Sequence, residues 1–147
     1  MINNLDKFFL AGMLPEEICT SFDISQNYRG LQIFKWISSG VQNFSQMNNV
    51  PKAILDELKQ KSYLRSSKIA QKFEDPDGTV KLQIELFDKQ CIETVLLIDK
   101  EGRKTACVSC QVGCAMKCAF CMTGTLGFSR NLFASEIVEQ FLHLEDV

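Results

Sequence analysis

The spacing of apolar residues along the chain changes at about residue 67. Before that point, apolar side chains recur at intervals of three and four, which predicts short helices. After it, they alternate with polar side chains or form short apolar runs, which predicts β-strands. We therefore expect a helical domain over residues 1–66, a β segment over 67–99 and a third part over 100–147.

Each predicted helix of the first part has a recognisable start or stop signal. The stretch 4–10 is rich in apolar residues, and Pro15, followed by two glutamates, suits the first turn of a second helix. A third helix over 28–37 would end at Gly40, and Pro51 would open a fourth. These helices are expected to share one core, formed by Cys19, Leu31, Ile33, Phe34, Trp36, Ile37, Phe44, Ile54, Leu55 and Leu58.

Three strands are predicted next, at 68–74, 79–87 and 91–99. The turn-forming residues of Asp75–Gly78 and Asp88–Gln90 separate them, which is typical of antiparallel hairpins.

The last part has the order strand, loop, helix. The turn Lys100–Arg103 precedes a short strand at 105–109, and a helix begins near Ala134 with Ser135 as its cap. Its apolar face would consist of Ile137, Val138, Phe141 and Leu142. Such a unit opens a parallel βα barrel, which ordinarily needs about 200 residues or more. The expected fold class is therefore α+β passing into α/β, with a barrel that is cut short.

The composition is that of a globular chain, with 46% hydrophobic and 23% charged residues among 147. A net charge of −2 gives no overall sign of nucleic-acid binding, and no apolar run approaches the ~20 residues of a membrane span. Seven cysteines, an odd count, without a signal peptide favour a reducing cytoplasm. The single histidine, His143, is expected at the surface or at a helix end.

Five of the seven cysteines stand within fifteen residues, a density typical of metal sites. Cys114, Cys118 and Cys121 have the spacing C-x3-C-x2-C, so three thiolates could face one metal centre from a single loop. In a [4Fe–4S] cluster, three cysteines leave one iron open to a small chelating ligand. Alternatively, Cys107 and Cys110 could join Cys118 and Cys121 as two C-x2-C pairs around zinc, although the pairs lie closer than is usual.

The three-cysteine spacing resembles the signature of radical S-adenosylmethionine (SAM) enzymes, and the flanking residues narrow the resemblance. They are similar to bacterial radical SAM adenine methyltransferases of the RlmN/Cfr type over nearly the whole chain. The matching motifs are Tyr28-Arg-Gly-x-Gln32, Trp36-Ile37, Phe44-x-x-Met47, Pro51-Lys52, Asp77-Gly-Thr79, Lys81, Ile92-Glu-Thr-Val95, Cys107-Val-Ser-x-Gln-Val-Gly-Cys114 and Gly127-Phe-x-Arg-Asn-Leu132.

The resemblance implies a fold and an activity. The fold would be a helix-hairpin-helix-like RNA-binding domain, an antiparallel β extension and the first β-loop-α unit of a truncated radical SAM barrel. The activity would be methylation of adenine C2 in 23S rRNA and tRNA, with a [4Fe–4S] cluster and SAM as cofactors. An external electron donor such as flavodoxin is implied. We expect a cytoplasmic monomer that does not associate with membranes.

The resemblance also implies residue roles. Cys114, Cys118 and Cys121 would be the cluster ligands, and Phe120 would flank the adenine of SAM. In the family, a methyl group carried on a C-terminal cysteine is activated by a radical and added to the adenine, which crosslinks protein and RNA. The position of Cys107 assists proton removal and releases the product by forming a disulfide with that cysteine. The position of Glu93 is that of the proposed general base.

Without the resemblance, Glu93 would be an outward-facing residue of a strand, and Cys107 a zinc ligand or a core thiol. The methyl-carrying cysteine and the later SAM-contacting segments have no counterpart in these 147 residues, so this fragment alone is expected to be inactive. The alternative function class is an RNA-binding module stabilised by zinc or an iron–sulfur cluster and without catalysis. The iron, sulfide and zinc contents of the protein distinguish the two.

Overall fold

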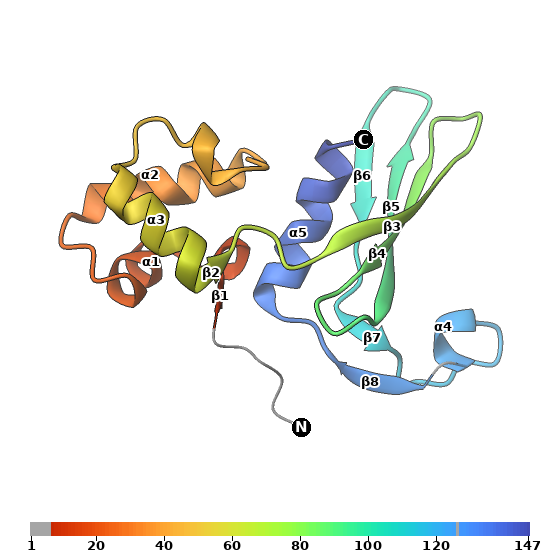
Figure 1. The fold of residues 1–147 in the computed structure, drawn as a ribbon. Coiled ribbons are helices and arrows are strands. Elements are labelled where there is room, and N and C mark those ends of the chain that lie inside the picture. Colours follow the sequence, from red (N-terminus) through yellow and green to blue (C-terminus); the bar gives the residue numbers. More distant parts are fainter. Residues whose placement is uncertain (1–6, 126) are drawn as a thin grey trace. The chain divides into compact units, whose positions relative to one another are not determined.

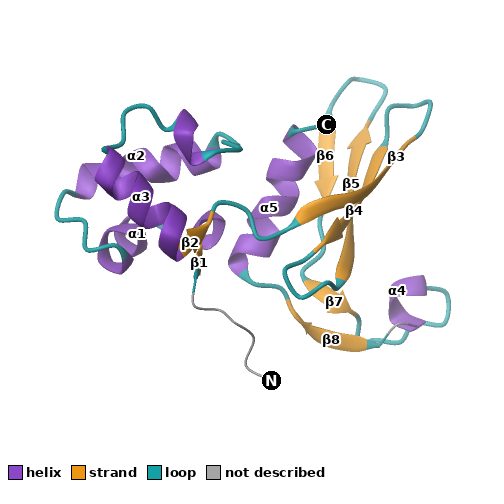
Figure 2. Cartoon of the chain, in the orientation of Figure 1, coloured by secondary structure: helices purple, strands orange, loops and turns teal. Residues whose placement is uncertain are grey.

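The computed structural model describes residues 7–125 and 127–147 of the chain (Figures 1 and 2). The chain divides into two compact units, Met1–Ser66 and Ser67–Val147. The described part of the first unit is mainly helical, and the second is built on β-sheets.

The described part of the first unit contains three α-helices: α1 (Pro15–Ser21), α2 (Asn27–Ser38) and α3 (Lys52–Lys61). Two 3-10 helices, η1 (Leu10–Gly12) and η2 (Phe44–Gln46), lie between them or before them. Two short strands, β1 (Phe8–Phe9) and β2 (Ser62–Tyr63), pair in parallel.

The predicted helix over 4–10 is wrong where it can be compared. Residues 4–6 lie outside the described part of the chain, and β1 and η1 occupy the rest of the stretch. The stretch is extended at Phe8 and Phe9 because these two adjacent aromatic rings pack on different partners. Phe8 packs on Phe22 at 5.3 Å between ring centroids, and Phe9 packs on Tyr63 at 5.9 Å. Successive side chains of a strand point to opposite faces, which permits both contacts.

The other helix boundaries are confirmed. Pro15 is the first residue of α1, where the carboxylate of Glu17 accepts a hydrogen bond of 2.7 Å from the Leu14 N–H. Pro51 caps the start of α3. Gly40 follows the end of α2 with a φ of +74°, a conformation that glycine adopts without strain.

The predicted core of the first unit is confirmed except at Leu31, which is 44% exposed. Gly30 lies on the buried face of α2 instead. A Cβ atom at Gly30 would lie 2.3 Å from the Pro15 carbonyl oxygen and 2.5 Å from the Cys19 Sγ. The absence of a side chain therefore lets α1 and α2 approach with their backbones almost in contact, and this turns Leu31 outward.

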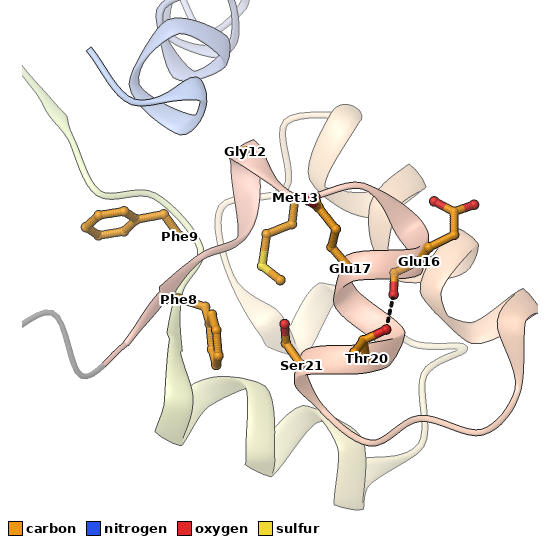
Figure 3. Close-up of a pocket in the computed structure, with 8 residues that line it drawn as sticks. All are labelled: Phe8, Phe9, Gly12, Met13, Glu16, Glu17, Thr20 and Ser21. Carbon is orange, nitrogen blue, oxygen red and sulfur yellow. Dashed lines mark hydrogen bonds between the residues drawn. The ribbon is translucent and has the colours of Figure 1, made fainter. Parts of the chain in front are cut away.

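A pocket of about 480 Å³ lies beside α1 in the first unit (Figure 3). Its lining combines apolar side chains with two carboxylates and two hydroxyls: Phe8, Phe9, Gly12, Met13, Glu16, Glu17, Thr20 and Ser21. The hydroxyl of Thr20 is already used, because it donates to the Glu16 carbonyl oxygen at 2.9 Å. The motifs singled out in the sequence place no function here.

The second unit is built on a four-stranded antiparallel sheet with the strand order β3-β4-β5-β6. Its strands are β3 (Lys68–Glu74), β4 (Val80–Glu85), β5 (Cys91–Ile98) and β6 (Lys104–Cys107). The predicted strands and hairpin turns are confirmed to within two residues. The sheet continues past residue 99, because β6 pairs with β5 from Val95↔Cys107 to Ile98↔Lys104.

In chain order, a second, two-stranded ribbon comes between this sheet and the last helix. It consists of β7 (Gln111–Gly113) and β8 (Phe128–Asn131), which pair antiparallel, and the loop between them carries the short helix α4 (Met122–Thr125). The last helix, α5 (Ala134–Glu145), follows β8. The cysteine loop therefore returns to a strand before the helix begins, a step that the predicted strand–loop–helix order lacked.

The predicted apolar face of α5 is confirmed for two of its four residues. Leu142 is buried and Ile137 packs partly buried against the core, but Val138 and Phe141 are exposed. The buried face is mainly polar and comprises Ser135, Glu136, Glu139, Gln140 and His143 together with Leu142 and Leu144.

Two details of the same helix also differ from the sequence-based expectation. Ser135 does not cap α5, because it is the second residue of the helix and Phe133 occupies the N-cap position, where the Glu136 carboxylate accepts the Phe133 N–H at 2.8 Å. His143 lies in the last turn, at the helix end as expected, but it is buried, with its Nε2 3.0 Å from the Ser67 Oγ. In the described part of the chain, no helix is long and apolar enough to cross a membrane.

Candidate active site

The cysteines of the C-x3-C-x2-C motif lie in the loop that joins β7 to β8, and all three are partly exposed. Two backbone hydrogen bonds shape this loop. The Cys114 N–H donates to the Gly127 carbonyl oxygen at 3.0 Å, and the Cys121 N–H donates to the Cys118 carbonyl oxygen at 3.1 Å. The first bond closes the base of the loop, and the second forms a tight turn between the last two cysteines.

Gly113 is required at the base of this loop. Its φ is +70°, and a Cβ atom built on it would lie 1.7 Å from the Gly127 carbonyl oxygen. No side chain fits at that separation, and other residues rarely adopt this φ. The close crossing of the two backbones fixes where the cysteine loop leaves the ribbon.

The donor set of the loop fits an iron–sulfur cluster by its chemistry. Cysteine thiolates are the usual ligands of such clusters, and three of them leave one iron open. In residues 7–125 and 127–147, however, no group of three or more Cys, His, Asp or Glu side chains is arranged to hold a metal ion. This applies to the three-cysteine set and equally to the two C-x2-C pairs considered for zinc. Phe120, between the second and third of these cysteines, is 94% exposed.

Glu93 and Cys107 lie on the same face of the four-stranded sheet. Cys107 pairs directly with Val95, and Glu93 is two residues from Val95 along β5. Residues opposite each other in an antiparallel pair share a face, and so do residues two apart in one strand. Both side chains are exposed on the face opposite the buried Leu82 and Ile92. Glu93 and Cys107, the two residues for which the resemblance implies catalytic roles, therefore lie on one face of the sheet.

The carboxylate of Glu93 has a cationic neighbour on the same face. Lys81 Nζ lies 3.3 Å from Glu93 Oε1 and 5.1 Å from the centroid of the Phe73 ring. Because both partners of the ion pair are about half exposed, the pair adds little to stability. It does orient the carboxylate along the sheet.

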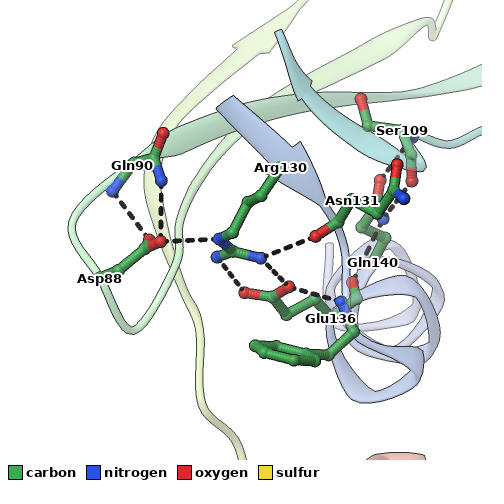
Figure 4. A network of polar contacts seen from close by, with 8 residues as sticks. Asp88, Gln90, Ser109, Arg130, Asn131, Glu136 and Gln140 are labelled. Atoms are coloured by element: carbon green, nitrogen blue, oxygen red, sulfur yellow. Dashed lines mark hydrogen bonds and ion pairs between the residues drawn. The ribbon is translucent and has the colours of Figure 1, made fainter. Parts of the chain in front are cut away.

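The segment that follows Cys107 is held by side chains. The Thr94 hydroxyl donates to the Cys107 carbonyl oxygen at 2.9 Å, and the Ser109 hydroxyl donates to the Glu93 carbonyl oxygen at 2.7 Å. The side-chain amide of Gln140 accepts the Ser109 N–H at 2.7 Å and donates to the Ser109 carbonyl oxygen at 2.9 Å. Figure 4 shows this pair of bonds between α5 and Ser109.

A second polar network centres on Arg130 of β8 (Figure 4). Its guanidinium makes two parallel bonds of 2.7 and 2.8 Å to the Glu136 carboxylate and a third of 2.8 Å to Asp88. The rings of Phe87 and Phe133 lie 5.2 and 5.3 Å from the guanidinium carbon. Arg130 therefore links the β4–β5 turn, the exit strand of the cysteine loop and the first turn of α5.

The charges in this network stabilise one another. The two bonds that Arg130 donates to Glu136 raise the pKa of Arg130 further above its usual value, although burial opposes the shift. Burial is the largest influence on Asp88 and would raise its pKa, but hydrogen bonds from Arg130 and Gln90 outweigh it, so the pKa of Asp88 is lowered. Asp88 and Arg130 are therefore both charged at neutral pH.

Sequence reasoning missed Glu136 and Gln140 as site-supporting residues and noted Thr94 and Arg130 only as parts of motifs. A signal was present in α5. Its buried polar residues Glu136, Glu139, Gln140 and His143 recur at intervals of three, one and three, the same helical spacing used to find apolar faces. A polar stripe at that spacing marks a buried hydrogen-bonding face when partners are available.

Residues 16–64 match the family model for the RlmN ribosomal RNA large subunit methyltransferase N-terminal domain. The probable dual-specificity RNA methyltransferase RlmN of Treponema pallidum is 51% identical over 136 residues, which cover 92% of this chain and 40% of that protein. The chain belongs to the RlmN family. The RlmN relative from Treponema denticola is 57% identical over 139 residues, covering 95% of this chain and 40% of its own length.

Structural similarity agrees with the assignment to RlmN. The crystal structure of a radical SAM methyltransferase from Sphaerobacter thermophilus matches 91% of this chain with a TM-score of 0.83 and 36% identity. The match covers 40% of that chain. The predicted resemblance is thus confirmed at the level of the family, and the chain spans about 40% of the length of the RlmN relatives above.

Proposed function

We propose that this chain is part of a radical SAM enzyme that methylates adenine C2 in 23S rRNA and tRNA. One observation carries the proposal: Glu93 and Cys107 share an exposed sheet face in a unit that also presents the three-cysteine loop on the β7–β8 ribbon. The relatives named RlmN, dual-specificity RNA methyltransferases, support the substrate class.

Cys114, Cys118 and Cys121 would hold a [4Fe–4S] cluster, and Phe120 would lie against the adenine of SAM. When bound, the cluster and SAM supply one-electron chemistry. Such chemistry suits this target, because the electrophilic C2 carbon of adenine carries no acidic proton. The three thiols are partly exposed and the Phe120 ring is exposed, so a cluster and SAM could reach them.

The chain's own residues would act after the adenine has been joined to a cysteine elsewhere in the protein. In that adduct C2 is tetrahedral, and its proton is acidic because loss of the proton restores the aromatic ring; Glu93 would accept this proton. The thiolate of Cys107 would then bond to the sulfur of the second cysteine, and the electrons of the carbon–sulfur bond would pass to the carbon, which takes up a proton as the methyl group. One disulfide forms and one carbon–sulfur bond breaks, so the step needs no further oxidant.

We further assign an RNA-binding role to residues 1–66 as a helix-hairpin-helix-like domain. On α2, the Arg29 guanidinium lies 4.7 Å from the Tyr28 ring, and that ring is 55% exposed. Exposed aromatic rings and guanidinium groups are typical RNA contacts. Residues 67–99 would be the β extension and 100–147 the start of the barrel. The enzyme would work as a cytoplasmic monomer with an electron donor such as flavodoxin.

Metal analysis of protein purified without oxygen tests the proposal. We expect about four irons and four sulfides per chain, lost in Cys118→Ser and retained in the control Cys91→Ser, which replaces an exposed cysteine with no assigned role. Zinc in place of iron, with RNA binding but no methylation by the complete protein, would establish the RNA-binding module instead. Multiple turnover by the 147-residue chain alone would contradict the need for a second cysteine elsewhere.

A further inference from the structure

We infer that Gln140 and Thr94 are positioning residues for Cys107, and that they govern product release without taking part in the earlier steps. The inference rests on the release role proposed for Cys107. It concerns two residues to which neither the motif nor the resemblance gives a role.

The need for positioning follows from the sheet. The β5–β6 ladder ends at the Val95↔Cys107 pair, so Cys107 is the last residue of its strand. The end of a strand frays unless the backbone beyond it is tied down. A thiolate that must meet one particular sulfur atom loses rate steeply when its approach is displaced, by about a hundredfold for 1 Å in sensitive cases.

Gln140 ties down the backbone beyond the ladder. Its side chain is fully buried, and its amide makes two bonds to the backbone of Ser109, one to the N–H and one to the carbonyl. This is the pattern that a neighbouring strand would supply. The helix α5 thus takes the place of the missing ladder partner two residues after Cys107.

Thr94 and Ser109 add further bonds to those of Gln140, and we call the whole set of bonds the clamp. Thr94, also fully buried, donates to the carbonyl of Cys107 itself, and Ser109 donates to the carbonyl of Glu93. One continuous set of bonds therefore runs from α5 through Ser109 to Glu93, and a separate bond holds Cys107 to β5. The backbone positions that carry the carboxylate and the thiol are thereby held next to each other on the exposed face.

The experiment uses the complete enzyme, reconstituted with its cluster, in a single turnover with RNA. Covalent protein–RNA adduct and released methylated RNA are followed separately on denaturing gels. In Gln140→Leu, adduct formation stays within about twofold of the wild type, while release slows about tenfold, so adduct accumulates. Thr94→Val, which keeps the shape of the side chain, slows release about threefold.

Two controls separate positioning from general damage. Asp99→Ala removes a carboxylate that accepts the backbone N–H groups of Glu101 and Arg103 in the β5–β6 turn, at the opposite end of the ladder from Cys107, and it leaves release unchanged. Amide exchange in the apoprotein tests the clamp without catalysis: the Ser109 N–H exchanges at least about tenfold faster in Gln140→Leu, while the β4 amides keep their protection.

The outcomes are decisive for this inference alone. Equal slowing of adduct formation and release in Gln140→Leu and Thr94→Val would show a merely structural role, and unchanged release in both would show none. Either result overturns the inference and leaves the proposed function standing. A wild-type enzyme that forms neither adduct nor product would instead refute the proposed function.

Discussion

The helices α3 and α5 are both amphipathic and both pack on a core, but they bury opposite kinds of side chain. α3 buries Leu58 and partly buries Ile54 and Leu55, while its charged residues face solvent. α5 buries mainly polar side chains, Glu136, Glu139 and Gln140 among them, beside Leu142 and Leu144, and it leaves Val138 and Phe141 exposed.

The difference has energetic consequences. Apolar burial is non-directional and roughly proportional to area, so partial losses are graded. A buried carboxylate or amide depends on specific partners, and removal of one partner leaves the other desolvated and unpaired. We therefore expect changes around α5 to be more abrupt than changes around α3, and to alter the site as well as the stability.

The largest effect is expected at Arg130. Arg130→Met leaves the fully buried Glu136 carboxylate without its cation and should destabilise the second unit by about 3–5 kcal/mol, measured by amide exchange in β4 and β5 during urea titration. The control Lys61→Met breaks an exposed pair with Glu57 and should cost less than about 0.5 kcal/mol. A double variant Arg130→Met with Glu136→Leu should be more stable than Arg130→Met alone; if it is not, the buried pair is not the cause.

Leu58→Ala in α3 should destabilise the first unit by about 3 kcal/mol, because it removes a fully buried side chain and leaves a cavity. The single tryptophan, Trp36, packs against this core and reports unfolding of the first unit by fluorescence. Leu31→Ala on the exposed face of α2 serves as the control and should cost well under half as much. Similar losses in both variants would contradict the burial described for α2 and α3.

Two glycines sharpen the same comparison at the level of the backbone. Gly30→Ala forces α1 and α2 apart and should cost about 1–3 kcal/mol in the first unit. Gly113→Ala should cost a similar amount in the second unit, and it should also lower the iron bound per chain, since the crossing with Gly127 sets the base of the cysteine loop. Gly102→Ala has a positive φ but open space around it, so it controls for conformational strain alone. Full iron content in Gly113→Ala would show that metal binding does not depend on the backbone crossing at the base of the loop.

The smallest expected effect is the pH dependence contributed by Asp88. Its pKa is lowered in the folded chain from the usual 3.8, so it adds stability at pH values above 3.8, and this contribution is lost as the pH falls through the lowered pKa. Asp88→Asn should be less stable than the wild type at pH 7 by about 1 kcal/mol or less. The difference should shrink at pH 3 and vanish at lower pH. A difference that grows with acidity would reverse the assigned sign.

Much of the fold follows from local signals in the sequence. Pro15, Gly40 and Pro51 mark helix boundaries through backbone chemistry, and the turns at 75–78 and 88–90 mark hairpins. These features depend on residues that are neighbours in the chain, which is why a single sequence reveals them. The same holds for the apolar core of the first unit, whose faces repeat at helical spacing.

The features that sequence reasoning missed depend on distant partners. β8 has no apolar alternation, and it is a strand only because β7 lies beside it. The polar face of α5 is buried because Ser109, Arg130 and Ser67 supply hydrogen-bond partners from elsewhere in the unit. At the site, the C-x3-C-x2-C spacing identified the loop, but the shared face of Glu93 and Cys107 required the register of β5 and β6.

The bonds of Ser67 bear on how the chain is synthesised. Ser67, the first residue of the second unit, is held by Glu139 and His143, which follow it by 72 and 76 positions. Contacts of such long range form late, since a long loop must close before they are gained. On the ribosome, the first unit can fold early, but the second cannot close until α5 has emerged from the exit tunnel. The cysteine loop is translated before α5, so the proposed cluster would have to be inserted after the unit has closed, or the thiols would need protection until then.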